Sequence, residues 1–246
     1  MFVTGPTGSG KTSTVYAVMS QINTRSKSIV SVEDPVEYRL DGVKQIQVNP
    51  RAGVTFPNAL RSILRADPDV VFIGEVRDGE TARIAADASI TGHLVLSTVH
   101  TNSAAATPMR LVDMGIEPYL VASALPLVAG QRLARKLCVN CAEIEEHPDL
   151  DLLRRMGADD ALLEGATIRH AVGCSRCRQS GYRGRVPLLE IKPVTEGISR
   201  MIVDRAASID IEKFAVQEGV HTLRASALRR VATGLLSADE MLRVIA

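Results

Sequence analysis

Gly5-Pro6-Thr7-Gly8-Ser9-Gly10-Lys11-Thr12 is the stretch of this 246-residue sequence that decides its fold. It fits the phosphate-binding pattern G-x-x-x-x-G-K-[ST], follows the apolar residues Phe2 and Val3, and precedes a helical pattern. In such a loop, backbone N–H groups point at a phosphate, Lys11 supplies positive charge to the β and γ oxygens, and the Thr12 hydroxyl ligates Mg²⁺. The sequence therefore predicts a core that binds ATP with Mg²⁺.

The pattern around this loop is that of an α/β domain. Short β-branched apolar runs alternate with alanine-rich helical stretches up to about residue 132, which predicts a parallel sheet wrapped by helices. The predicted strands cover 29–32, 70–73 and 94–99, and the predicted helices cover 12–22, 58–64, 79–90 and 104–114.

Composition and charge exclude several classes of protein. The chain is 46% hydrophobic and 23% charged, with 29 basic and 28 acidic side chains, which is typical of a globular protein and not of a disordered or collagenous chain. A net charge of +1, 4 Phe, 4 Tyr and no Trp argue against nucleic-acid binding. Without a membrane-spanning run or a secretory signal, the cytoplasm is the expected compartment.

The pattern changes character twice, which predicts three parts. Residues 1–132 form the α/β core, residues 133–192 carry the cysteines, and residues 193–246 are helical, with Ser237-Ala-Asp-Glu240 as a capping box for the last helix. Within the second part, the insertion 142–173 holds 8 acidic and 3 basic residues, so we expect it to be solvated.

Carboxylates follow two of the predicted strands. Glu75 comes shortly after 70–73, where it can hold the metal through water or accept a proton from the attacking water, and it is our first choice for general base. A strand-end carboxylate that only caps the next helix is the alternative. Glu33-Asp34-Pro35-Val36-Glu37 follows 29–32 at the same sheet edge, where it either orders magnesium-bound water or is a solvated turn.

Arginines and histidines flank this region. Arg61 and Arg65 stand at i and i+4 on one helix face, where they are either surface charges or, in a ring, reach the γ-phosphate of the neighbouring subunit. Arg77 lies beside them in the predicted site. His100 ends the strand 94–99, where it or the Thr101 hydroxyl can report the presence of the γ-phosphate. A structural role is the alternative for a strand-end histidine.

Four cysteines form two C-x₂-C pairs. Cys138 and Cys141 are separated from Cys174 and Cys177 by 32 residues, longer than the usual zinc-ribbon spacing of about 15–20. Four thiolates suit a closed, structural Zn²⁺ site, and the basic residues nearby offset its negative charge. A redox pair, a disulfide or free thiols are the alternatives. These basic residues are Arg132, Arg135, Lys136, Arg176 and Arg178.

Together these motifs resemble a known family. The phosphate loop, Glu33-Asp-Pro, Gly74-Glu-Val-Arg-Asp78 and Gly92-His to Thr98-Val-His100-Thr-Asn look like the Walker A, aspartate, Walker B and histidine boxes of bacterial secretion ATPases, in the same order. The assembly-type members, of type II secretion and type IV pili, also carry a tetracysteine subdomain, followed as here by Gly181-Tyr-Arg-Gly-Arg185.

The resemblance implies a RecA-like P-loop core in hexameric rings, in which ATP hydrolysis drives insertion of pilin-like subunits from the inner membrane. By residue, it implies phosphate binding by Gly8, Gly10, Lys11 and Thr12, catalytic or metal-water roles for Glu33 and Glu75, inter-subunit fingers at Arg61 and Arg65, and γ-phosphate contact by His100. The implied partners are an inner-membrane platform protein and a cytoplasmic-face adaptor, with no nucleic acid and membrane contact only through partners.

One departure from the family pattern bears on activity. The family's core follows a regulatory domain and a PAS-like domain, whereas this chain begins four residues before its phosphate loop. We therefore expect a fragment or an upstream start, with weak hydrolysis by this chain alone. The alternatives are a nucleotide-gated binding module without turnover, a RecA-type nucleic-acid translocase and a P-loop kinase for a small acceptor.

Overall fold

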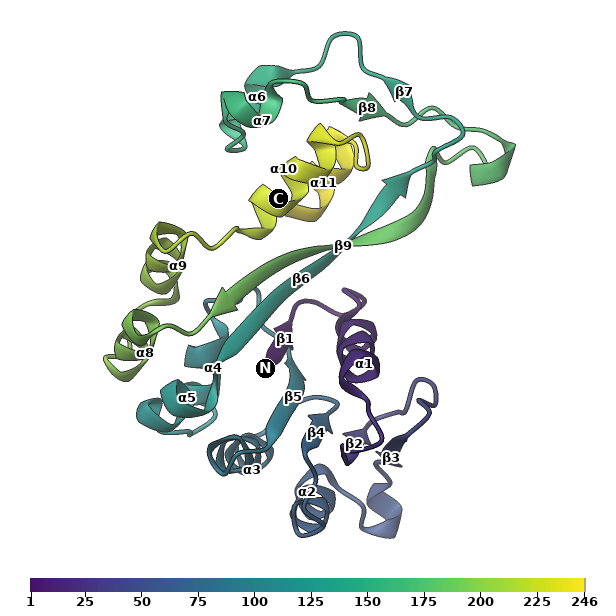
Figure 1. Cartoon of the computed structure of the whole chain (residues 1–246). Helices are drawn as coiled ribbons and strands as arrows, with labels where there is room; N and C mark the ends of the chain where they lie inside the picture. The colour runs from purple at the N-terminus through teal and green to yellow at the C-terminus, as the bar shows by residue number, and fades with distance from the viewer. Residues whose placement is uncertain (246) are drawn as a thin grey trace. The chain divides into compact units, whose positions relative to one another are not determined.

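The computed structural model describes residues 1–245 and divides them into two compact units (Figure 1). Unit 1 comprises Met1–Gly130 and Ile191–Gly219, and unit 2 comprises Gln131–Glu190 and the residues from Val220 onward. The expected boundaries after residues 132 and 192 fall inside the strands β6 (Leu127–Leu137) and β9 (Tyr182–Pro193), each of which contributes residues to both units. The three-part division therefore stays a prediction.

The sheet is parallel through its first six strands, which confirms the α/β prediction. Its order is β3-β2-β4-β5-β1-β6-β9. The strand β5 thus lies between β1, which leads into the phosphate loop, and β4, which leads to Glu75. The remaining bounds are β1 (Phe2–Thr4), β2 (Ile29–Glu33), β3 (Val43–Gln47), β4 (Val70–Ile73) and β5 (Leu94–Val99).

The helices of unit 1 follow the predictions closely, with one late start. The predicted helix 104–114 begins only at Thr107, because Pro108 has no N–H to donate and is tolerated only in a first turn. The bounds are α1 (Lys11–Ile22), the 3₁₀ turn η1 (Pro50–Ala52), α2 (Phe56–Leu64), α3 (Gly79–Ile90), α4 (Thr107–Asp113), α5 (Pro118–Ala124), α8 (Glu196–Val203) and α9 (Ser208–Gln217).

The core of unit 1 fixes the helix that follows the phosphate loop. Tyr16 and Met19 of α1 are fully buried against Val3, Phe72 and Leu96 from three neighbouring strands. Burying side chains of this size stabilises a fold by about 1.5–3 kcal/mol each. The start of α1, and with it the loop, is therefore held rigidly at the carboxyl end of β1.

Unit 2 corrects two expectations. The acidic insertion is not simply solvated, because Leu153, Ala158 and Ile168 are buried in one cluster with residues of the C-terminal helices. Its charged residues are outward-facing, whereas its apolar ones supply core. The elements are β7 (Glu143–Ile144) paired antiparallel with β8 (Arg169–His170), α6 (Leu150–Arg155), α7 (Asp160–Leu163), η2 (Ser175–Cys177), α10 (Leu223–Ala232) and α11 (Ala238–Ile245).

The predicted capping box of α11 is only half formed. Ser237 Oγ accepts the Glu240 N–H at 3.2 Å, as expected. The Glu240 carboxylate, however, binds the guanidinium groups of Arg135 and Arg243 instead of the Ser237 N–H, because two cations compete for it. Across residues 1–245, none of the helices is long and apolar enough to cross a bilayer.

Candidate nucleotide site and candidate metal centre

The phosphate loop has the backbone that its glycines allow. Gly10 is left-handed (φ 84°) and caps the N-terminus of α1, and Gly8 (φ 78°) has no atom within 4 Å of where a Cβ would be. Lys11 is buried, and its Nζ donates to Gly5 O at 2.9 Å and Pro6 O at 3.2 Å. The loop therefore combines the positive charge of Lys11 with open space beside Gly8 at the N-terminus of a helix. This arrangement suits a phosphate.

Glu75 reaches the same edge of the sheet from β4. Gly74 favours this close approach, because a Cβ there would lie 3.1 Å from Glu33 Cα, a tight contact that would require the backbone of β2 to shift by a few tenths of an ångström. The Glu75 side chain is only 14% exposed, forms an ion pair with Arg77, and lies 3.7 Å from His100 Nε2 through Oε2. Residues far apart in sequence thus meet at the carboxyl ends of β4 and β5.

His100 stands between two charges of opposite sign. The imidazole is 52% exposed, and its partial burial lowers its pKa. The positive charge of Lys11 lowers this pKa further, and Arg77 adds to the effect, while Glu75 opposes it. The neutral imidazole is therefore favoured at pH 7. The structure brings together Lys11, Glu75 and His100 of the predicted site, with Thr12 next to Lys11 at the start of α1.

Glu33 is placed differently from Glu75. It is 1% exposed at the end of β2, and its carboxylate accepts hydrogen bonds from the hydroxyls of Tyr16 and Ser31 and from Gln45 Nε2 at 3.2 Å. Burial, and next the bond to Glu33, raise the pKa of Tyr16. Glu33 thus ties α1 to β2 and β3, at the start of the segment that carries Asp34.

The two predicted finger arginines lie on α2 and at its end. Arg61 forms an ion pair with Glu80 of α3 at 2.6 Å, and both side chains are more than half exposed. Arg65 caps the C-terminus of α2 and is exposed. Among residues 1–245, neither arginine forms a hydrogen bond or ion pair with the phosphate loop. Their role as inter-subunit fingers stays a prediction.

Tertiary structure adds two residues, Tyr16 and Thr4, and several contacts that the motifs do not reveal. Tyr16 holds Glu33, and Arg77 is the arginine of the three that contacts Glu75. A third addition is the pair Thr4 and Thr101, whose hydroxyls meet beside the loop. Tyr16 and Thr4 carry no sequence signal of their own, because their partners come from other strands.

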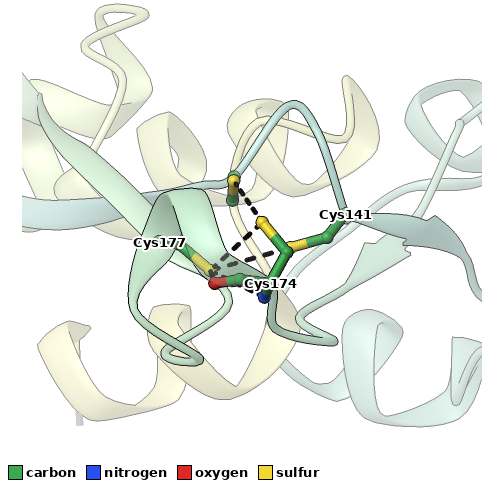
Figure 2. A group of neighbouring side chains, drawn as sticks. Cys141, Cys174 and Cys177 are labelled. Atoms are coloured by element: carbon green, nitrogen blue, oxygen red, sulfur yellow. Dashed lines mark hydrogen bonds between the residues drawn. The ribbon is translucent and has the colours of Figure 1, made fainter.

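The four cysteines form one cluster in unit 2 (Figure 2). All four Sγ atoms lie within 4.8 Å of one another, with Cys138–Cys174 at 4.0 Å and Cys141–Cys177 at 3.8 Å. A tetrahedral site with Zn–S bonds of about 2.3 Å needs sulfur–sulfur distances of about 3.8 Å. A disulfide needs about 2.0 Å, so the donor set fits a metal and none of the four is paired covalently.

Backbone groups support the thiolates. Burial acts to raise the pKa of Cys177, but the N–H groups of Cys174 at 3.1 Å and Gly181 at 3.2 Å stabilise its thiolate and lower the pKa to about 6. Of the basic residues expected nearby, Arg176 donates to Asn140 Oδ1 within the first knuckle. Arg135 is committed to Glu240 instead.

The fold and the site define a P-loop nucleotide-binding protein. In its sheet, β5 lies between β1, which leads into the phosphate loop, and β4, which leads to Glu75. Residues 1–243 match the family described as Type II/IV secretion system protein. The chain belongs to this family.

Similar proteins extend this result. The type IV pilus assembly ATPase PilB of Thermus thermophilus is 44% identical over 240 residues, which are 98% of this chain and 27% of that protein. The type II secretion system ATPase E of Vibrio cholerae is 45% identical over 244 residues, 99% of this chain and 48% of that protein. The chain thus spans about a quarter to a half of these relatives.

Solved structures agree on the fold. The pilus retraction motor PilT with bound ADP has a TM-score of 0.72 at 28% identity, covering 98% of this chain and 60% of that one. The ATPase DotB of Legionella pneumophila has a TM-score of 0.70 at 22% identity, covering 98% of this chain and 58% of that one.

Proposed function

We propose that this chain is the ATP-hydrolysing part of a hexameric motor that drives assembly of pilin-like fibres, in type II secretion or type IV pilus extension. The observation that carries this proposal is the pair Glu75 and His100, 3.7 Å apart at one edge of the sheet, close enough to the phosphate loop for the charge of Lys11 to act on His100. The names of the relatives, a pilus assembly ATPase and a secretion ATPase, supply the process.

In the proposed reaction, each residue acts from the place that the fold gives it. The loop N–H groups and Lys11 bind the β- and γ-phosphates. Glu75, a partly buried carboxylate, accepts the proton of the attacking water. His100 is neutral at pH 7 and donates a hydrogen bond to the γ-phosphate without adding a full charge.

Mg²⁺ would be held by the Thr12 hydroxyl and would neutralise charge on the β and γ oxygens. Glu33 stays a predicted participant at this edge. Its buried hydrogen bonds to Tyr16 and Ser31 support a contribution through the order of the Asp34 segment.

The motor proposal extends beyond one chain. In a ring, Arg61 and Arg65 would stabilise transition-state charge in the neighbouring subunit. The proposed partners are an inner-membrane platform protein and a cytoplasmic-face adaptor, which would place the motor in the cytoplasm at the inner membrane. We propose that the tetracysteine cluster binds Zn²⁺ and that the platform protein docks on the region around it. Replacing this region with another sequence tests the docking, because unchanged secretion would argue against it.

Steady-state ATP hydrolysis measured against protein concentration tests the proposal. Specific activity should rise with concentration, because Arg61 and Arg65 complete the site in trans, and it should vanish in Glu75→Gln. Glu117→Gln is the matched control, since Glu117 is a carboxylate ion-paired with an arginine, Arg83, outside the site. Flat or absent turnover with intact ATP binding would instead identify a nucleotide-gated module.

A further inference from the structure

Three threonine hydroxyls meet beside the phosphate loop. Thr4 ends β1, Thr101 follows His100 directly, and Thr107 opens α4. The Thr101 N–H donates to Thr4 Oγ1 at 3.0 Å, and the Oγ1 atoms of Thr101 and Thr107 are 2.9 Å apart. Thr4 and Thr107 are 1% and 0% exposed, so water does not compete for these bonds.

The Thr101 hydroxyl has partners on every side within the protein. Thr101 Oγ1 donates to Ser103 O at 2.9 Å and can then accept from the hydroxyls of Thr4 and Thr107, and Thr4 Oγ1 also lies 3.1 Å from Thr101 O, to which it can donate. A hydroxyl has one proton and two lone pairs, so Thr101 can use all of its hydrogen-bonding capacity inside the protein. Its hydroxyl has no proton left for a phosphate, which separates its role from that of His100.

This hydroxyl chain joins the two halves of the nucleotide site. Thr4 directly precedes Gly5, whose carbonyl oxygen accepts a hydrogen bond from the Lys11 ammonium group. Thr101 directly follows His100, whose imidazole lies 3.7 Å from Glu75. The bonds between Thr4 and Thr101 therefore continue the pairing of β1 with β5, in which Thr4 lies opposite Val99, into the segment that carries His100.

We propose that Thr101, held by Thr4 and Thr107, is a positioning residue that fixes His100 between Lys11 and Glu75 so that this segment discriminates ATP from ADP. The discrimination rests on the proposed function of the site, whereas the positioning itself is a property of the folded chain. The link to Thr107 extends the same contact to the start of α4.

The first test uses the chain without nucleotide. The imidazole of His100 is titrated by NMR, its signal identified by its loss in His100→Ala, in wild type, Thr101→Val and Thr101→Ser. Thr101→Val removes the hydroxyl's bonds to Thr4, Thr107 and Ser103 and leaves the backbone bonds to Thr4 Oγ1. The segment should loosen, so that His100 loses part of its burial and of its proximity to Lys11 and Arg77, and its pKa should rise towards the ordinary value. Thr101→Ser keeps the hydroxyl and should titrate like wild type. An unchanged titration in Thr101→Val would overturn the proposal.

The second test compares ATPγS with ADP by calorimetry. Thr101→Val should weaken ATPγS binding by about tenfold, the effect of one hydrogen bond to a charged group, and leave ADP binding within about twofold. Combining it with His100→Ala should add little further loss, because both changes remove the same contact. Equal losses for both nucleotides, or fully additive losses, would contradict the proposal.

Two controls separate the possible failures. Thr91→Val removes a hydroxyl that lies 3.1 Å from another histidine, His93, and it should change neither measurement. If Thr101→Val does not fold, Thr107→Val breaks the chain from the α4 side and is expected to shift the His100 titration in the same direction. The wild-type chain could fail to bind either nucleotide while Thr101→Val still raises the pKa of His100. That result would contradict the proposed function and support the positioning role.

Discussion

The nucleotide edge of unit 1 and the tetracysteine cluster of unit 2 are built on opposite plans. At the nucleotide edge, the charged groups come from the ends of separate strands, with Glu75 held between Arg77 and His100. In the cluster, all ligands come from two short knuckles, and four thiols face one another without an open position. The first arrangement suits a ligand that is bound and released during a reaction, whereas four thiolates without an open position suit a metal that stays bound for structure.

Metal removal should have the largest effect and should be confined to unit 2. Zinc binding contributes on the order of 10 kcal/mol in small structural sites, so chelation or Cys138→Ser is expected to abolish cooperative unfolding of this unit. Thermal unfolding with the zinc content measured in parallel checks this. Val139→Ser changes an exposed residue of the same knuckle and should leave both quantities as in wild type. A chain that retains its unfolding transition without metal would make the cluster something other than a structural site.

Lys11→Ala should produce the converse result, confined to unit 1. Removing the charge from the loop is expected to weaken ADP and ATPγS binding by about 100-fold or more, with the zinc content unchanged. Calorimetric titration of each nucleotide measures this loss. Lys27→Ala is a control on an exposed lysine. Wild-type affinity in Lys11→Ala would show that the loop does not bind the phosphates.

Acid should destabilise unit 2 through Glu240. Burial acts to raise the pKa of this carboxyl, but its bonds to Arg243 and Arg135 outweigh burial and lower the pKa to about 2. Because the pKa of Glu240 is lower in the folded state than in the unfolded state, its ionised carboxylate adds to the free energy of unfolding above pH 5. This contribution is lost as the pH falls towards 2.

Glu240→Gln measures this contribution. The variant should be less stable than wild type by about 2 kcal/mol at pH 7, and the difference should shrink towards pH 2. Urea unfolding of both proteins at each pH gives the difference, and loss of metal in acid affects both alike. A difference that stays constant with pH would argue against an ionised Glu240.

Arg61→Gln should have the smallest effect on the fold. Its ion pair with Glu80 is exposed at both ends, so we expect the free energy of unfolding to change by less than about 1 kcal/mol. Chemical unfolding measures this, with Arg83→Gln as an equally exposed arginine for comparison. If stability is unchanged, a loss of ATP hydrolysis in Arg61→Gln shows that Arg61 acts in the nucleotide site and not in folding. A large loss of stability would instead make Arg61 a structural residue.

Sequence patterns were most informative where a short segment determines its own structure. The strands β4 and β5 and the helix α3 begin and end where the pattern predicts, because hydrophobic periodicity and capping residues act locally. The late start of α4 and the half-formed capping box of α11 depart from the patterns. In the capping box, Arg135, 105 residues away in sequence, takes the carboxylate that the local pattern assigns to a backbone N–H.

Residue types at fixed spacing are enough to identify the phosphate loop, the acidic strand ends and the two cysteine knuckles, because each motif needs only a few residues. Contacts made in the folded chain bury Glu33 against Tyr16, pair Arg77 rather than Arg61 with Glu75, and hold Thr101 against Thr4. Arg77 and Glu75 are only two residues apart, in the segment after β4, whereas the other two contacts join residues that are distant in sequence. Their geometry depends on strand order, in which β5 lies between β1 and β4, and no local pattern encodes that order.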